Sequence, residues 1–305
     1  MDREYSAGHV AALITIVIWG TTYISTKLLL EDFEPVEILF IRFAIGFLVL
    51  LVASPRIIRG ATREQELTFV AAGLCGICLY YLLENIALTY TLASNVGMIA
   101  SITPFFTAIA MQVFMKGEET LRANFFVGFV VALVGIFILS FNGTQLELNP
   151  KGDVLALLAG VAWALYSVLT RKISTFGYGT VQVTRRVFLY GLIFMVPCLF
   201  LLPNGWNTAD LLETDNLLNI LYLGFGASAL CFVTWNYSVR ILGAVKTSVY
   251  IYIIPVVTVV TSVIVLHEPV TVLSLIGILL CFVGLALSED RLVDRVLGRT
   301  GSRQV

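Results

Sequence analysis

Long apolar runs separated by short polar segments follow one another along almost the whole chain. A helix of about 20 residues is long enough to cross about 30 Å of hydrocarbon. Ten runs approach or exceed that length: residues 10–30, 36–53, 68–90, 94–115, 124–141, 154–170, 181–202, 217–239, 247–266 and 270–288. The pattern predicts an all-α, polytopic membrane protein with ten transmembrane helices.

Basic residues gather at the ends of the runs that share one side of the predicted membrane. They include Arg3, Arg56, Arg59, Arg63, Lys116, Arg122, Arg171, Lys172, Arg240, Lys246 and the arginines of the tail 291–305. The opposite side has Lys27 and Lys151 among a larger number of acidic residues. By the positive-inside rule, the multi-pass chain has both termini, and its basic tail 291–305, in the cytoplasm.

The two halves of the chain resemble each other. A shift of 144 residues aligns Trp19 with Trp163, and a shift of 151 aligns Pro104 with Pro255. The polar stretch 142–151 leaves five runs on each side. Because five is odd, the second half enters the membrane from the opposite side, as in inverted-repeat transporters. We therefore predict two five-helix repeats, 1–144 and 145–290, around a central cavity.

Composition narrows the class of protein further. Only 13% of the residues are charged, 58% are hydrophobic and the mean hydropathy is +0.92, which excludes an ordinary soluble protein. The segment from Cys75 to Cys78 spells CGIC, but it lacks the βαβ context of a redox motif. No soluble basic domain is present to bind nucleic acid. The lipid bilayer and a small-molecule substrate are the expected partners.

Two matching stripes of aromatic and hydroxyl side chains lie in the first and sixth runs. Trp19 and Trp163 sit near the middle of their runs, although tryptophan in membrane proteins favours the interfaces. At helical spacing Tyr23 follows the first tryptophan, and Tyr166 and Ser167 follow the second. The stripes predict either a shared substrate cavity between the halves or hydrogen bonding between packed helices.

The third and eighth runs carry a second pair of matching polar clusters. The members are Tyr80, Tyr81, Glu84 and Asn85 in the third run, and Trp235 and Asn236 in the eighth. A carboxylate inside a membrane is costly unless it is protonated, paired or hydrated. Glu84 is therefore a candidate for proton coupling or for binding a substrate ammonium group, and a structural, hydrogen-bonded role is the alternative.

Prolines interrupt the fourth and ninth runs. Pro104 and Pro255 each remove a backbone hydrogen bond and favour a kink, so we predict that they act in gating. Polar residues precede the second proline on the cytoplasmic half of its run, and they are further candidates for substrate binding. They are Lys246, Ser248, Tyr250 and Tyr252.

Glycines seven residues apart occur in the fifth and tenth runs. Gly128 and Gly135 share one helix face, as do Gly277 and Gly284. Such faces permit close approach of helices in lipid. The spacing predicts helix packing, and it leaves a homodimer contact open.

Two longer segments carry a resemblance to a known family. The segments are ASNVGMIASITPFFTAIAMQVFMKGEETL in the first half and GAVKTSVYIYIIPVVTVVTSVIVLHEPVT in the second. With Arg42 and the acidic residues Glu118 and Glu268, they resemble the EamA domain of the drug/metabolite transporter (DMT) superfamily. The aromatic central positions look most like YddG-type bacterial amino-acid exporters. The resemblance implies an exporter of the bacterial inner (plasma) membrane that works by alternating access and needs no cofactor.

These observations favour a secondary transporter that exports small metabolites, with neutral and aromatic amino acids as the expected substrates. The alternative is an exporter or antiporter of another metabolite or drug class, such as a purine, a phosphorylated sugar or a nucleotide-sugar. A phosphate would need fixed cations, and the central runs offer almost none beyond Lys246. An intramembrane enzyme is disfavoured, because His9 and His267 lie at run ends and no catalytic or metal-binding cluster can be assembled around them.

Overall fold

The computed structural model describes residues 2–90, 93–117, 122–140, 149–203, 205, 208–266 and 272–288. Within these ranges the chain forms helices joined by turns and short connections, without a β-strand, so the all-α class is confirmed for the described chain. The tail 291–305, Glu118 and Glu268 lie outside the described residues.

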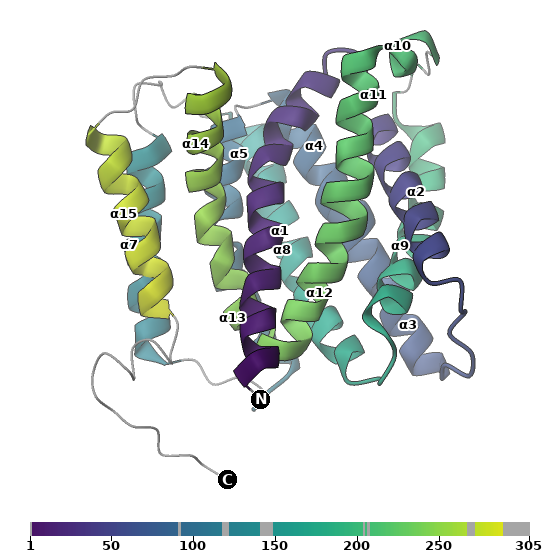
Figure 1. Cartoon of the computed structure of the whole chain (residues 1–305), viewed down its shortest axis with the longest axis horizontal. Helices are drawn as coiled ribbons and strands as arrows, with labels where there is room; N and C mark the ends of the chain where they lie inside the picture. Colours follow the sequence, from purple (N-terminus) through teal and green to yellow (C-terminus); the bar gives the residue numbers. More distant parts are fainter. Residues whose placement is uncertain are drawn as a thin grey trace.

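The two halves contain corresponding series of helices, labelled in Figure 1. The first half consists of α1 (Asp2–Leu29), α2 (Pro35–Ala53), α3 (Arg63–Ala72), η1 (Gly73–Leu79), α4 (Tyr80–Tyr90), α5 (Ala93–Ala100), α6 (Thr103–Phe114) and α7 (Ala123–Ser140). The second half consists of α8 (Pro150–Ser174), α9 (Thr180–Leu201), α10 (Thr208–Leu212), α11 (Thr214–Leu221), η2 (Tyr222–Leu230), α12 (Cys231–Leu242), α13 (Ala244–Ser248), η3 (Val249–Ile253), α14 (Ile254–Leu266) and α15 (Val272–Ser288).

Six helices of the described chain are long and apolar enough to span a membrane. They are Arg3–Leu29, Pro35–Ala53, Arg63–Tyr90, Pro150–Ser174, Thr180–Leu201 and Thr214–Leu242. Shorter apolar helices occupy the other four predicted runs: Thr103–Phe114, Ala123–Ile138, Ala244–Thr258 and Leu275–Ser288. The structure thus supports a multi-pass protein, and the count of ten spans stays a prediction.

Local sequence signals fix where several helices begin. Asn149 caps α8 by accepting hydrogen bonds from the backbone N–H groups of Lys151 and Gly152. At the start of α2, the carboxylate of Glu37 accepts from the backbone N–H of Glu34 and closes a capping box. Since each cap satisfies backbone N–H groups that a helix leaves unpaired, these starts need no external partner.

The third run of each half contains a π-helical segment, which the sequence analysis did not predict. η1 separates α3 from α4, and η2 separates α11 from α12 at the equivalent place. The N–H of Tyr80 bonds the carbonyl of Cys75, and that of Cys231 bonds the carbonyl of Gly226, five residues back in each case. Short π-helical segments inside α-helices are frequent at functional sites.

The fourth run of each half is a broken helix. In the first half the chain turns at residues 101–102 between α5 and α6. In the second half the 3₁₀ segment η3 lies between α13 and α14. Pro104 and Pro255 each occupy the second residue of the helix after the break, where a missing N–H costs no intrahelical bond. The prolines therefore mark helix starts in addition to the predicted kinks.

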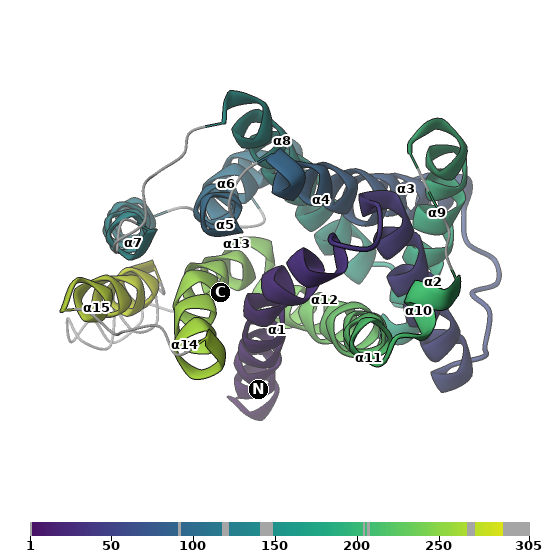
Figure 2. The ribbon, with the colours of Figure 1, turned by 90° about the horizontal axis from the view of Figure 1, so that it is seen from above.

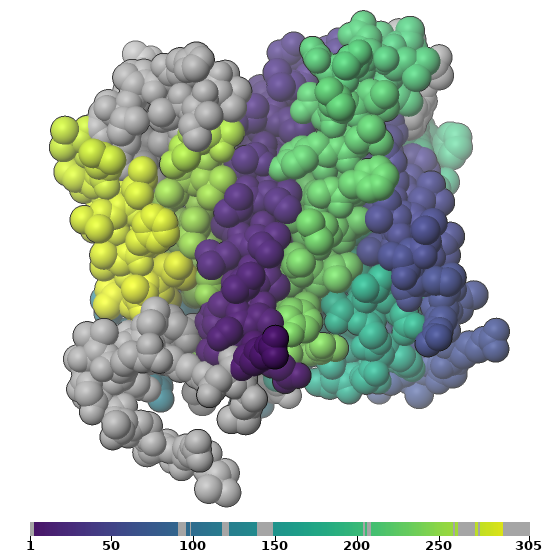
Figure 3. Space-filling view, in the orientation of Figure 1, coloured from purple at the N-terminus to yellow at the C-terminus, as the bar shows by residue number. Residues whose placement is uncertain are grey.

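Each half packs against the other by equivalent contacts. The first helix of each half packs on the last α-helical segment of the other half's third run. Thus α1 packs on α12, and α8 packs on α4. The second helix of each half lies on the opposite π-helical segment, α2 on η2 and α9 on η1. Figure 3 shows α1 in contact with the α11–η2–α12 run along one face of the molecule. The two halves therefore form one body with a long seam.

The last helices, α7 and α15, form a pair at one edge of the molecule (Figure 2). Gly128 faces the carbonyl of Gly284, whereas Gly135 faces the carbonyl of Gly277. Residue numbers thus rise along one helix as they fall along the other, so the pair is antiparallel. Because all four glycines serve close packing within one chain, the structure supports the helix-packing interpretation, and homodimerisation stays untested.

Candidate functional site

Three tryptophans from different helices meet at the seam between the halves. The ring centroid of Trp19 on α1 lies 5.3 Å from that of Trp163 on α8 and 5.2 Å from that of Trp235 on α12. The residues aligned by the internal repeat, Trp19 and Trp163, are therefore in edge-to-face contact. Such aromatic pairs add about 0.5–1.5 kcal/mol beyond burial of their area.

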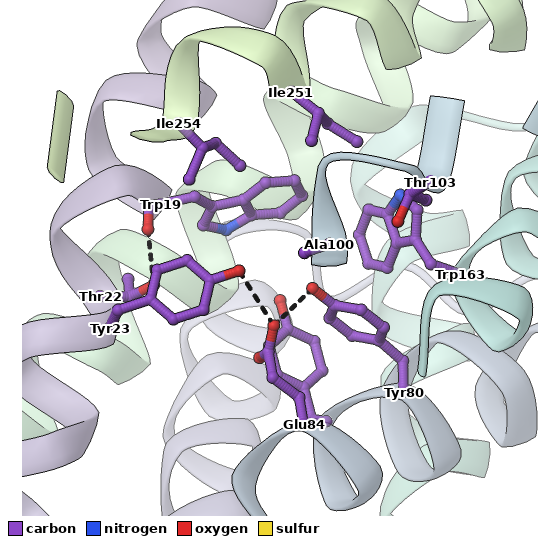
Figure 4. Close-up of a pocket in the computed structure, with 11 residues that line it drawn as sticks. Trp19, Thr22, Tyr23, Tyr80, Glu84, Ala100, Thr103, Trp163, Ile251 and Ile254 are labelled. Atoms are coloured by element: carbon purple, nitrogen blue, oxygen red, sulfur yellow. Dashed lines mark hydrogen bonds between the residues drawn. The ribbon is translucent and has the colours of Figure 1, made fainter. Parts of the chain in front are cut away.

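A small pocket lies beside this cluster (Figure 4). Its lining consists of Trp19, Thr22, Tyr23, Tyr80, Tyr81, Glu84, Ala100, Thr103, Trp163, Ile251 and Ile254. The space open to the centre of a water-sized sphere is about 30 Å³. A water needs about 10–15 Å³ by this measure, so the pocket holds two or three waters at most and is closed to a metabolite in this conformation.

Glu84 is the acidic residue of the pocket. Its carboxylate oxygen Oε1 accepts hydrogen bonds from the hydroxyl of Tyr80 on the same helix, at 2.7 Å, and from that of Tyr23 on α1, at 3.2 Å. Figure 4 shows the carboxylate between these two hydroxyls. The other oxygen, Oε2, takes part in no hydrogen bond with the described residues. One oxygen is thus held by tyrosines, and the other is available to a ligand.

The buried Arg42 packs against Tyr81 and is not part of the pocket lining. Its guanidinium carbon is 4.7 Å from the centroid of the Tyr81 ring, and its Nε donates to the hydroxyl of Ser228 at 3.1 Å. Its Nη2 is buried without a hydrogen-bond partner, and no described carboxylate lies within 4 Å of it. Arg42 supplies positive charge near Glu84 without forming an ion pair with it.

The two central indole N–H groups are in different situations. Nε1 of Trp19 donates to the backbone carbonyl of Ala227, inside the π-helical segment η2, at 3.0 Å. Nε1 of Trp163 is buried and has no partner among the described residues. The π-helical segment thus fixes one pocket tryptophan, whereas the other keeps a free donor.

The structure brings together six of the predicted substrate-binding residues. Trp19, Tyr23, Tyr80, Tyr81, Glu84 and Trp163 all line the pocket. Equivalent helices of the two halves supply both tryptophans, whereas the tyrosines and the carboxylate come from the first half alone. The lining is therefore chemically asymmetric across a symmetric seam.

The other candidates on the third, sixth and eighth runs lie outside the lining, in contact with neighbouring helices. The amide of Asn85 donates to the carbonyl of Pro35 at 3.4 Å. Asn236 accepts from the hydroxyl of Tyr166 at 2.9 Å and donates to Thr184. The hydroxyl of Ser167 bonds the carbonyl of Trp163, and the fully buried Trp235 packs behind Trp19 and Trp163.

The candidates that precede Pro255 also lie outside the lining. Lys246 is half-buried on α13, and the hydroxyl of Ser248 bonds the carbonyl of Val245. Tyr250 forms a hydrogen bond with His9 on α1. Tyr252 is fully buried, and its ring centroid lies 6.4 Å from that of Phe129 on α7. Each of these side chains lies among neighbouring helices in this conformation.

The broken helices contribute residues to the pocket that were not predicted from the sequence. Ala100 and Thr103 flank the turn between α5 and α6, and Ile251 and Ile254 flank the end of η3. The available signal was the pair of prolines, because Pro104 and Pro255 each directly follow one of these lining residues. Among the described residues, no group of three or more His, Cys, Asp or Glu side chains could hold a metal ion.

Curated transporters resemble the chain over nearly its whole length. An "uncharacterized transporter" of Archaeoglobus fulgidus is 26% identical over 94% of this chain and 98% of its own. The Bacillus subtilis "uncharacterized transporter YvbV" is 28% identical over 90% of this chain and 89% of its own. A "probable terminal-alkyne amino-acid exporter" of Streptantibioticus cattleyicolor is 25% identical over 93% of this chain and 94% of its own.

A solved crystal structure shares the fold. It superimposes with a TM-score of 0.78 at 22% sequence identity, covering 95% of this chain and 99% of the other. The sequence profile of the EamA-like transporter family matches residues 6–141 and again residues 150–289, which together make up most of the chain. With two such matches, transporter relatives of equal length and a pocket at the seam between the matched units, the chain belongs to the EamA-like transporter family.

Proposed function

We propose that this transporter exports small amphiphilic metabolites, with neutral and aromatic amino acids as its substrates, across the bacterial inner membrane by alternating access. The observation that carries the proposal is the pocket where Trp19, Trp163 and Glu84 meet at the seam between the two halves. Sites at the interface of duplicated units are characteristic of secondary transporters.

The chemistry of the lining supports this substrate class. Indole and phenol faces can stack on an aromatic side chain and attract an ammonium group. Glu84 has one carboxylate oxygen held by Tyr23 and Tyr80 and one available to a ligand. Among the relatives, the Streptantibioticus cattleyicolor protein is a probable terminal-alkyne amino-acid exporter.

The closed pocket supports alternating access. An amino acid cannot fit into a cavity of about 30 Å³, so the halves must separate around the aromatic cluster before a substrate can enter. The broken helices beside Pro104 and Pro255 supply backbone discontinuities at the pocket wall. Discontinuous helices at the substrate site are a recurring device in transporters.

The proposed topology of the chain has ten membrane spans in two inverted units, with both termini in the cytoplasm. The antiparallel packing of α7 on α15, the last helix of each half, supports this relation. So does the exchange of equivalent contacts between the halves. Both features are expected when two units are related by an axis in the membrane plane.

Phosphate-bearing substrates are disfavoured by the same lining. The pocket residues include one carboxylate and no lysine, arginine or histidine. A phosphate group brings negative charge that basic side chains must meet, and the buried Arg42, which packs against Tyr81, is not part of the lining.

Export from inside-loaded vesicles tests the function. Vesicles that contain the protein are loaded with radiolabelled tryptophan, phenylalanine, methionine or threonine, and efflux is followed with and without a pH gradient. Faster efflux than from empty-vector vesicles supports the proposal. No protein-dependent movement of any of the four under either condition overturns the amino-acid assignment.

A variant of the pocket separates a binding role from packing. Trp163→Ala is expected to impair efflux while the amount of protein in the membrane stays the same, because the side chain forms one wall of the pocket. Trp163→Phe, which keeps an aromatic face, should retain more activity than Trp163→Ala. Normal efflux by the alanine variant would assign this tryptophan to packing alone.

A further inference from the structure

We infer that this site recognises the ammonium group of its substrate and has no built partner for a carboxylate, so that organic amines are bound at least as well as the amino acids of the same skeleton. The inference rests on the proposed function, because it concerns the same pocket. The inference goes beyond the proposed function because it makes the carboxylate of an amino acid dispensable for binding.

The charge of the lining supplies the first argument. Of the eleven lining residues, Glu84 alone has a carboxyl group, and none has a basic side chain, so the one formal charge that the lining can carry is negative. Its oxygen Oε1 is occupied by two tyrosine hydroxyls, and Oε2 takes part in no hydrogen bond with the described residues. A cation that enters this pocket meets a carboxylate oxygen, whereas an anion meets like charge in a poorly hydrated space.

The aromatic walls supply the second argument. Trp163 and Tyr80 lie side by side, with ring centroids 4.7 Å apart, and Trp19 closes the cluster at 5.3 Å from Trp163. The faces of such rings attract ammonium groups through their negative quadrupole, most strongly where water is excluded. A carboxylate gains nothing from these faces.

Arg42 is the closest candidate for a carboxylate partner, and its position argues against that role. The side chain is 2% exposed, its guanidinium carbon lies 4.7 Å from the centroid of the Tyr81 ring, and it is not among the residues that line the pocket. Contact with a substrate carboxylate would therefore require a change from this conformation. The neutral donors that remain in the lining, which include Nε1 of Trp163, the hydroxyl of Tyr81 and the threonine hydroxyls, contribute less than a cation would.

The class of ligand that fits best is a primary or quaternary amine with one flat apolar group. Four compounds with a common phenyl-ethyl skeleton isolate the charge: phenethylamine is cationic, phenylalanine zwitterionic, 3-phenylpropionate anionic and phenethyl alcohol neutral. Binding to the purified full-length protein in detergent is measured by competition against radiolabelled phenethylamine. Quenching of intrinsic tryptophan fluorescence provides a second readout.

We expect phenethylamine to bind at least about tenfold more tightly than 3-phenylpropionate, and no more weakly than phenylalanine. Glu84→Gln should bring the amine-to-acid ratio close to one while phenethyl alcohol still binds, which shows that the pocket is intact. Glu66→Gln, at an ion pair with Arg186 outside the pocket, serves as the matched control and should keep the wild-type ratio.

Tighter binding of phenylalanine than of phenethylamine would overturn the inference, and so would three further outcomes. The first is binding of 3-phenylpropionate as tight as that of phenethylamine, which would assign Arg42 to the substrate. The second is an unchanged ratio in Glu84→Gln. The third is no binding of any of the four compounds to the wild-type protein. Export of radiolabelled amino acids is measured separately, so protein-dependent efflux together with any of these results would sink the amine preference and leave the proposed function standing.

Discussion

Helices α4 and α12 occupy equivalent places in the two halves, each following a π-helical segment, yet they present different side chains to the seam. A shift of 151 residues aligns Tyr81 with Phe232 and Glu84 with Trp235. On α4 these positions line the pocket, whereas on α12 both are fully buried in the aromatic cluster. One helix therefore provides the polar wall, and the other provides the packing against which that wall is held.

The difference shows that equivalent helices of a duplicated fold can present different chemical groups to the same site. The backbone arrangement is repeated, including the π-helical segment and the asparagine after the variable position. The variable position itself carries a carboxylate in one half and an indole in the other. A single carboxyl group at this pair of equivalent positions avoids the repulsion that two facing carboxylates would create.

Truncation of Trp235, the packing residue on α12, gives the largest expected effect on stability. Trp235→Ala should lower the free energy of unfolding by about 3–5 kcal/mol, because it leaves a cavity among buried rings. Unfolding of the purified protein in mixed detergent micelles measures this change. Glu84→Gln, at the equivalent position, keeps the side-chain shape and should shift stability far less. Equal losses for the two variants would contradict the division of roles.

The π-helical segments allow a second test, in which the expected change in stability is of intermediate size. A Cβ on Gly76 would lie 2.2 Å from the ring of Tyr166, so Gly76→Ala should destabilise by about 1–3 kcal/mol. Gly226→Ala in the other segment is the control, since its nearest neighbour would be 3.6 Å away. That variant should be neutral or slightly stabilising. A neutral Gly76→Ala would mean that η1 does not pack closely against Tyr166 on α8.

The two equivalent asparagines give the smallest expected difference. Asn236 makes two side-chain hydrogen bonds, at 2.9 Å and 3.0 Å, whereas Asn85 makes one at 3.4 Å. At about 0.5–1.5 kcal/mol for each bond, Asn236→Ala should cost about 1 kcal/mol more than Asn85→Ala. The same unfolding assay compares them. The reverse order would indicate that Asn85 has a partner in another conformation of the transporter.

Much of the architecture could be predicted from the apolar runs and the internal repeat. The contact between Trp19 and Trp163 follows from their shared place in a duplicated sequence. The grouping of Tyr80 with Glu84 could also be predicted, because residues four apart lie on one face of a helix. These features depend on helical spacing and symmetry, which the sequence displays directly.

Asn85, which was predicted to join Tyr80, Tyr81 and Glu84 in one site, lies outside the pocket lining for a geometric reason. Adjacent residues of a helix point about 100° apart, so Asn85 faces α2 while Glu84 faces the pocket. The π-helical segments were missed because their wider turn has no distinct apolar period in so short a stretch. The contribution of Ile251 and Ile254 depends on where a broken helix lies in space, which no local pattern records.

The small volume of the closed pocket affects how any affinity for this protein should be interpreted. When the form that can admit a ligand makes up only a fraction of the molecules, the measured Kd is the intrinsic value divided by that fraction. An open form at about one molecule in a hundred would weaken the apparent affinity about a hundredfold. Substitutions that loosen the contact between Trp19 and Trp235 could thus tighten apparent binding without touching the ligand. Weak ligands of the resting protein can be strong ligands of the open form.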